Sequence, residues 1–204
     1  MITLVKLWDR RVLMSPDAVA ASAGDERITY TELDERASVL AKLLRARGVG
    51  PEQLVGVCVD RSIQLVVAML GILKAGGAVV PLRPSDRAER LRHMVSDSGV
   101  RLVLCESPES TPIPSEDVEL FEVDKLRLIA ETGRVAPLVE PDNLASVIYM
   151  PGTTGRPNRV SITHASIVNF LRGMTKRLGR PPLPFDLGIL ETLAARIIAQ
   201  SRLG

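Results

Sequence analysis

The sequence of 204 residues is poor in aromatic side chains, cysteine and histidine. Aromatic residues make up 3% of the chain, so a hydrophobic core has to be built from Val, Leu, Ile and Ala. The longest apolar stretch, residues 65–82, is interrupted by Lys74 and by Gly76 and Gly77, which argues against a membrane span. Charges occur too early at the N-terminus for a signal peptide. These features predict a cytoplasmic protein without a membrane partner.

The two cysteines and two histidines do not form a recognisable metal-binding or redox motif. Cys58 and Cys105 each lie within an apolar run, without C-x-x-C spacing, and we expect buried, reduced thiols. His93 and His164 are isolated in the sequence, without metal-ligand spacing around them. The sequence therefore predicts no metal site built from these residues.

Composition and charge indicate a globular chain of ordinary type. Apolar residues make up 46% and charged residues 25%, enough for a real core at this length. The net charge is +2, but eight Lys or Arg and two acidic residues follow from Arg156 onward. Cations near the C-terminal half of a predicted helix complement the helix dipole, and no aromatic stacking platform accompanies them. Nucleic acid is therefore not an expected partner.

Hydrophobic periodicity predicts alternating strands and helices. Thr31 to Gly48 has apolar residues at helical spacing, with Thr31 and Asp34 placed to cap its start. The other predicted elements are strands over 54–59, 78–82, 101–105 and 120–123, helices over 62–75, 88–98 and 161–178, and irregular connections over 106–119 and 132–143. This order predicts an α/β fold with a mostly parallel sheet and helices on both faces.

Residues 144–160, LASVIYMPGTTGRPNRV, combine a predicted strand with a loop rich in glycine and threonine. Gly152 and Gly155 permit backbone conformations and close approaches that a Cβ would prevent, while Thr153 and Thr154 supply hydroxyl groups. Successive backbone N–H groups in such a turn can bind an anion, so the loop is typical of a di- or triphosphate site. It lacks the Gly-Lys-Ser/Thr end of a Walker loop.

Several segments together resemble the adenylation domains of nonribosomal peptide synthetases, within the adenylate-forming enzymes. They are the loop at 149–160 (YMPGTTGRPNRV), residues 15–20 (SPDAVA), 28–33 (ITYTEL), 73–82 (LKAGGAVVPL) and 89–91 (ERL). The resemblance implies an incomplete adenylate-forming N-terminal core and ATP-dependent activation of an amino acid to an aminoacyl-adenylate. It implies ATP and Mg as cofactors, with the nucleotide bound by Gly152, Thr153, Thr154, Gly155 and Arg156.

Three positions in or beside the loop depart from the family pattern. Pro151 replaces a serine or threonine and supplies neither a hydroxyl nor a backbone N–H. Asn158 replaces a lysine, and Arg159 replaces a glycine. Arg156 and Arg159 could restore the positive charge, although a guanidinium copies the geometry of a lysine poorly.

The resemblance places the adenine and ribose segments, the acidic magnesium ligand and the catalytic lysine later than any residue found here, so no catalytic residue is predicted. Residues 185–191, FDLGILE, are similar to the block whose aspartate binds the α-amino group of the substrate, which would give Asp186 that role. Asp186 could instead cap the last predicted helix, residues 186–201, and we favour the cap. We divide the chain into a partial core, residues 1–178, and a proline break with an amphipathic helix, residues 179–204.

The last predicted helix carries an apolar stripe that includes Leu187, Leu190, Leu193 and Ile197. It could fold back on the core, self-associate, or bind a second polypeptide. Three hypotheses follow: an inactive, truncated adenylation domain; a non-catalytic interaction module for a synthetase or carrier protein; and one half of a split adenylation enzyme.

Overall fold

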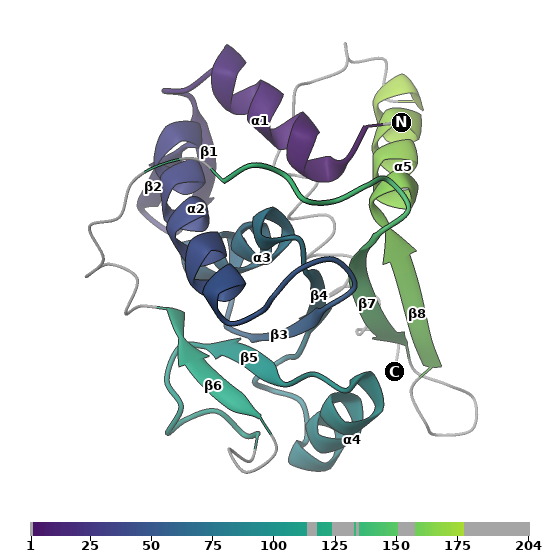
Figure 1. Ribbon diagram of the computed structural model, residues 1–204. Helices are drawn as coiled ribbons and strands as arrows, with labels where there is room; N and C mark the ends of the chain where they lie inside the picture. Colours follow the sequence, from purple (N-terminus) through teal and green to yellow (C-terminus); the bar gives the residue numbers. More distant parts are fainter. Residues whose placement is uncertain (1, 114–117, 124–132, 134, 151–157, 178–204) are drawn as a thin grey trace.

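The structure, a computed structural model, describes residues 2–113, 118–123, 133, 135–150 and 158–177. Its elements, labelled in Figure 1, are α1 (Leu4–Met14), β1 (Val19–Ala23), β2 (Glu26–Thr29), α2 (Tyr30–Ala46), β3 (Leu54–Cys58), α3 (Ile63–Ala75), β4 (Ala78–Pro81), α4 (Ala88–Ser98), β5 (Leu102–Cys105), β6 (Glu119–Glu122), β7 (Leu144–Met150), β8 (Asn158–Thr163) and α5 (His164–Arg177).

Within the described residues, six strands form one sheet in the order β6-β5-β3-β4-β7-β8. Neighbouring strands are parallel except for β7 and β8, which form an antiparallel pair. β1 and β2 form a separate antiparallel hairpin beside α2. The predicted mostly parallel α/β sheet is therefore confirmed.

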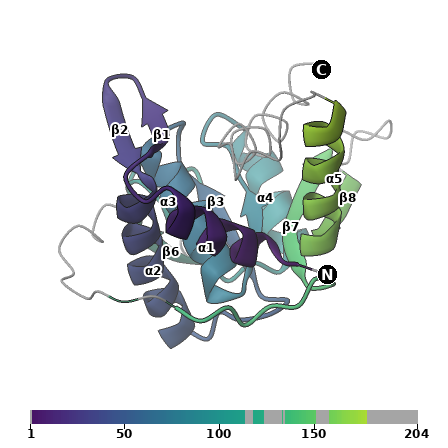
Figure 2. The ribbon, with the colours of Figure 1, turned by 90° about the horizontal axis from the view of Figure 1, so that it is seen from above.

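Helices cover both faces of the sheet, and the alternation of side chains along the strands divides the core in two. Val57 and Leu104 face one buried cluster, to which α1, α2, α3 and α5 contribute. Cys58 and Val103 face the other, which α4 covers through Leu91, Met94 and Val95. Figure 2, seen from above, shows α4 on the opposite side of the strands from α1 and α2. As predicted, the buried clusters are mainly aliphatic.

Two elements differ from the sequence predictions. No helix was predicted over 4–14, where α1 buries Leu4, Val5, Trp8 and Val12. Residues 161–163 were predicted to begin a helix but lie in β8, because their backbone pairs with β7 in the antiparallel hairpin. The helix begins at His164.

The predicted cap of α2 was also wrong. The N-cap is Thr29, whose side chain accepts a hydrogen bond from the backbone N–H of Glu32, while the Glu32 carboxylate accepts from Thr29 N. These backbone and side-chain hydrogen bonds lower the pKa of Glu32. Thr31 instead donates through its hydroxyl to the carbonyl of Pro16, which joins α2 to the segment before β1.

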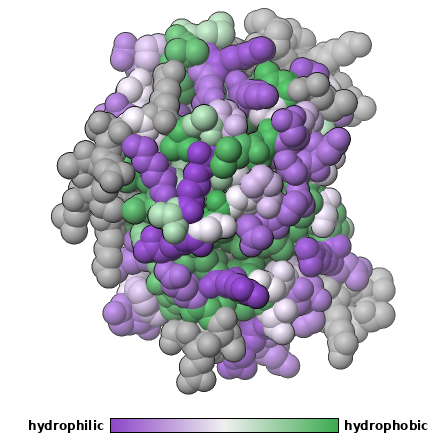
Figure 3. Space-filling view, viewed as in Figure 1, coloured by the Kyte–Doolittle hydropathy of each residue, from purple (hydrophilic) through white to green (hydrophobic). Residues whose placement is uncertain are grey.

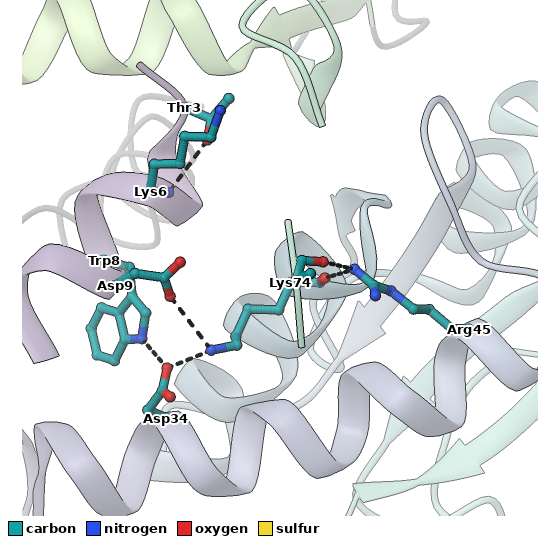
Figure 4. A network of polar contacts seen from close by, with 8 residues as sticks. Thr3, Lys6, Trp8, Asp9, Asp34, Arg45 and Lys74 are labelled. Atoms are coloured by element: carbon teal, nitrogen blue, oxygen red, sulfur yellow. Dashed lines mark hydrogen bonds and ion pairs between the residues drawn. The ribbon is translucent and has the colours of Figure 1, made fainter. Parts of the chain in front are cut away.

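Asp34, the second predicted cap residue, lies in a buried polar network between α1, α2 and α3 (Figure 4). Its Oδ1 accepts from Lys74 Nζ at 2.5 Å and from Trp8 Nε1 at 2.6 Å. Asp9 lies 3.8 Å from the same ammonium. The Lys74 side chain is 1% exposed, so its charge depends on these carboxylates rather than on water.

The block LKAGGAVVPL has structural roles around this lysine. Gly76 ends α3 with a φ of 102°, a left-handed conformation that favours glycine. A Cβ on Gly77 would lie 2.8 Å from a Val49 methyl group. Arg45 of α2 donates to the carbonyls of Lys74 and Ala75 at the same helix end, at 2.8 and 3.1 Å. These contacts fix the turn from α3 into β4.

Long-range hydrogen bonds place β7 beside β4. The Ser146 hydroxyl donates to the carbonyl of Val79 at 2.9 Å, across 67 positions of sequence. At the start of β7, the Glu52 carboxylate accepts from the Asn143 side chain and from Leu144 N. Arg45 also donates to the carbonyl of Ala136 at 2.6 Å, which holds the preceding connection against α2.

The surface is mixed in polarity. Figure 3 shows hydrophilic side chains over much of the face seen in Figure 1, with hydrophobic side chains visible between them. Among the described large apolar residues, Leu13, Met14, Val19 and Leu138 are more than half exposed, and the first three lie near the end of α1 and the start of β1. No helix in the described part of the chain is long and apolar enough to cross a bilayer.

We expect Asp34→Ala to lower the free energy of unfolding by about 3–5 kcal/mol, because it leaves the buried Lys74 ammonium without its nearest partner. Urea denaturation measures the change. Glu35→Ala, at the neighbouring exposed position of α2, is the control and should stay within about 0.5 kcal/mol of the parent. A loss below about 1 kcal/mol for Asp34→Ala would show that the ion pair is dispensable.

Candidate functional site

The residues predicted to bind nucleotide and substrate lie outside the described part of the chain. This applies to Gly152, Thr153, Thr154, Gly155 and Arg156, to Asp186, and to the apolar stripe of the last predicted helix. Both flanks of the glycine-rich loop are described, however. Met150 ends β7 and Asn158 begins β8, and these two residues are cross-strand partners. The loop sequence therefore connects two adjacent strands of a hairpin.

The end of β7 lies at the same sheet edge as the carboxyl ends of β3 and β4, because these strands are parallel. The chain leaves β3 for α3, on one face of the sheet, and leaves β4 for α4, on the other. Such a switch between faces opens a crevice at the strand ends, where α/β proteins bind ligands. The described geometry therefore favours this edge as the functional site.

Tyr149, the next-to-last residue of β7, contacts α4 at this edge. Its hydroxyl donates to Asp97 Oδ2 at 2.6 Å, and its ring is buried. Burial, and then the Asp97 carboxylate, raise the pKa of the Tyr149 phenol, which keeps the group protonated as a donor. Arg90, in the preceding turns of α4, donates from Nη2 to the Tyr149 carbonyl at 3.4 Å.

Arg83, Asp86 and Arg90 form a charged cluster between the end of β4 and the first turn of α4. Asp86 accepts from Arg83 Nη2 at 2.8 Å and lies 3.5 Å from Arg90 Nε. The Asp86 side chain is 12% exposed and the Arg90 side chain 29%. One guanidinium thus reaches from the turn after β4 to the backbone of β7. Arg90 belongs to the block ERL, in which no functional residue was predicted.

On the β8 side of the hairpin, Asn158 and Arg159 are exposed. Arg159 is the cross-strand partner of Tyr149, so its charge is at the same edge as the loop. This position is compatible with Arg159 compensating for the missing lysine.

The cysteines are buried and free, as predicted. Cys58 and Cys105 are in-register partners on β3 and β5. Burial, with a smaller contribution from Cys105, raises the pKa of the Cys58 thiol to about 12, so it is a poor nucleophile at neutral pH. Among the described residues, no group of three or more His, Cys, Asp or Glu could hold a metal ion.

His164 is a further buried titratable group, at the opposite end of β7. Its backbone N–H donates to the carbonyl of Asn143, and its side chain is fully buried. Neither ring nitrogen has a hydrogen-bond partner among the described residues. Burial lowers the pKa of His164 to about 4, partly opposed by the Glu52 carboxylate.

Comparison with known proteins gives the family. The family model described as AMP-binding enzyme matches residues 8–198. Bacitracin synthase 1 of Bacillus licheniformis is 37% identical over 98% of this chain and 4% of its own length. Zwittermicin A synthase ZmaJ of Bacillus cereus is 35% identical over 91% of this chain and 37% of its own length. The chain thus spans a minor part of these relatives.

Solved structures agree with the sequence relatives. A crystal structure of the nonribosomal peptide synthetase FmoA3 matches with a TM-score of 0.82 and 28% identity, over 93% of this chain and 21% of that one. The N-terminal subdomain of NpsA from Klebsiella oxytoca matches with a TM-score of 0.75 and 25% identity, over 83% of this chain and 44% of that one. This chain belongs to the AMP-binding enzymes, among the adenylation domains of nonribosomal peptide synthetases.

We expect His164 to make the chain less stable in acid. The unfolded chain binds this proton below a pKa of about 6.5 and the folded chain only below about 4, so stability falls as the pH falls from 6.5 to 4. The loss from this group is about 3 kcal/mol. Urea denaturation at several pH values should show a shallower decline for His164→Gln than for the parent, whereas the control His93→Gln should follow the parent. Equal declines for all three proteins would assign the acid sensitivity to other groups.

Proposed function

We propose that this chain binds the phosphates of MgATP through the loop Gly152 to Arg156, as the phosphate-binding part of an adenylation domain. One observation carries the proposal: the loop sequence joins β7 to β8, and β7 lies next to β4, where the helices after β3 and β4 go to opposite faces of the sheet. The similar FmoA3 structures include an AMPPNP-bound form, which supports nucleotide binding. Backbone N–H groups of such a turn, with Thr153 and Thr154, would hold the phosphate oxygens.

The family reaction joins an amino acid to AMP. A carboxylate oxygen of the amino acid attacks the α-phosphorus of ATP, a mixed anhydride forms, and pyrophosphate leaves with the electrons of the broken P–O bond. Bound magnesium would neutralise charge on the phosphates. The contribution of this chain would be to orient the triphosphate, and positioning and electrostatics supply most of the rate of such transfers.

We propose further that these 204 residues do not catalyse this reaction by themselves. Pro151 withholds a hydroxyl and an N–H from the loop, and Asn158 lacks the charge of the family lysine. The segments that the family uses for adenine, ribose, magnesium and the catalytic lysine have no counterpart in this sequence. A loop that binds phosphate cannot align a carboxylate with the α-phosphorus without them.

An interaction role is the second candidate. The apolar stripe of Leu187, Leu190, Leu193 and Ile197 suits a helix that packs against another polypeptide, and the basic residues after Arg156 suit an acidic surface. The partner would be a synthetase segment, a carrier protein or the other part of a split enzyme. Adding the partner would restore catalysis only if the partner is the other part of a split enzyme.

Two assays test these proposals. In calorimetry with magnesium, ATP should bind at least tenfold more tightly than AMP, which lacks the β- and γ-phosphates, and the double variant Thr153→Ala/Thr154→Ala should lose most of that difference. Equal affinities for ATP and AMP would refute the proposal that the loop binds the β- and γ-phosphates.

The second assay is amino-acid-dependent exchange of pyrophosphate into ATP, for which the chain by itself should give only the background rate. Clear exchange with any amino acid would refute the inactive assignment. Exchange that appears only on addition of the polypeptide bearing the later family segments would identify a split enzyme.

A further inference from the structure

The carboxyl-terminal half of β7 pairs with β8 along one edge and contacts α4 through Tyr149. β4 and β7 pair at Val79 and Ser146, and β7 continues for four residues beyond Ser146. β4 itself ends at Pro81. Over this extension, the α4 side chains Asp97 and Arg90 contact Tyr149, one through its hydroxyl and one through its carbonyl.

We propose that Arg90, Asp97 and Tyr149 are positioning residues for the nucleotide loop that follows Met150 in the sequence. This inference rests on the proposed function of that loop. A phosphate-binding turn works only if its amides are held in place before the ligand arrives, so the strand that leads into it must be fixed. The contacts of α4 hold that strand at its next-to-last residue.

The Arg90 guanidinium faces two elements at once. Its Nη2 donates to the Tyr149 carbonyl, whereas its Nε lies 3.5 Å from Asp86 Oδ2, an ion-pair contact rather than a hydrogen bond. Asp86 is itself held by Arg83, in the turn that follows β4. The ends of the neighbouring strands β4 and β7 are therefore connected by a chain of contacts that runs through Asp86 and Arg90 to Tyr149. A lysine ammonium is a compact point charge on a flexible stem and does not reproduce this planar fork.

The Tyr149 hydroxyl provides the second support. Tyr149 is a buried residue, and its hydroxyl donates at 2.6 Å to the carboxylate of Asp97, an exposed residue of α4. Tyr149→Phe preserves the ring, and with it the packing against the α4 cluster, but removes the hydrogen bond. The variant thus separates positioning from core packing.

The test uses the full chain and the variants Arg90→Gln, Arg90→Lys and Tyr149→Phe, with Arg92→Gln as control. Arg92 is an exposed arginine of the same helix, so its replacement changes the net charge as Arg90→Gln does. Calorimetry with MgATP should show at least tenfold weaker binding for Arg90→Gln and Arg90→Lys and about fivefold weaker binding for Tyr149→Phe, with Arg92→Gln within twofold of the parent. Parent-like binding by Arg90→Lys would mean that charge, rather than position, is needed, and would overturn the proposal.

Hydrogen exchange supplies a readout that does not need nucleotide. In Arg90→Gln and Tyr149→Phe, amide exchange should rise at least tenfold over 144–150 and 158–163 and stay within twofold over β3. Unchanged exchange in the hairpin would overturn the positioning role. If the parent chain does not bind MgATP at all, the proposed function fails, and the exchange results alone then decide whether α4 holds the end of β7.

Discussion

The buried ion pair between Lys74 and Asp34 is the interaction on which the packing of the first three helices depends. An ammonium that is 1% exposed is tolerable only where carboxylates and hydrogen bonds replace its water. Asp34 meets that need from α2, Asp9 approaches from α1, and Trp8 adds a donor to the same carboxylate oxygen. Sliding any of these helices by one residue would separate the charges, so the network selects one arrangement among the many that aliphatic packing alone would permit.

Long-range hydrogen bonds from side chains also connect the helices to the sheet. Arg45 satisfies carbonyls at the end of α3 and one in the connection before β7, while Glu52 accepts two hydrogen bonds at the start of that strand. Ser146 then ties β7 to β4, and α4 contacts its far end through Tyr149. β7 is therefore specified at its beginning, middle and end by side chains from distant parts of the sequence. A strand that delivers the chain to a ligand loop benefits from being held in this way.

Local pattern predicted most of the sheet and its helices, because strands such as Leu54–Cys58 are short apolar runs and α2 and α3 have clear periodicity. β8 was missed because Val160 and Ile162 alternate over too few residues to oppose a helical interpretation of the sequence that follows. Asp34 was taken for a cap because its partner Lys74 lies 40 positions away. The candidate loop was found from Gly152 and Gly155, whereas the roles of Arg90 and Asp97 arise from tertiary contacts that no spacing rule encodes. The loop itself and Asp186 lie outside the described residues.

The larger buried cluster joins the first and last helices of the described chain: Leu4 and Val5 of α1 belong to it together with Ile167 and Leu171 of α5. During synthesis on a ribosome, α1 is made before α5 and cannot complete its burial until Leu171 has emerged. Its apolar face must wait, either in partial contact with α2 and α3 or under the protection of a chaperone. The packing of α1 is therefore completed late, although α1 precedes the other described helices in the sequence.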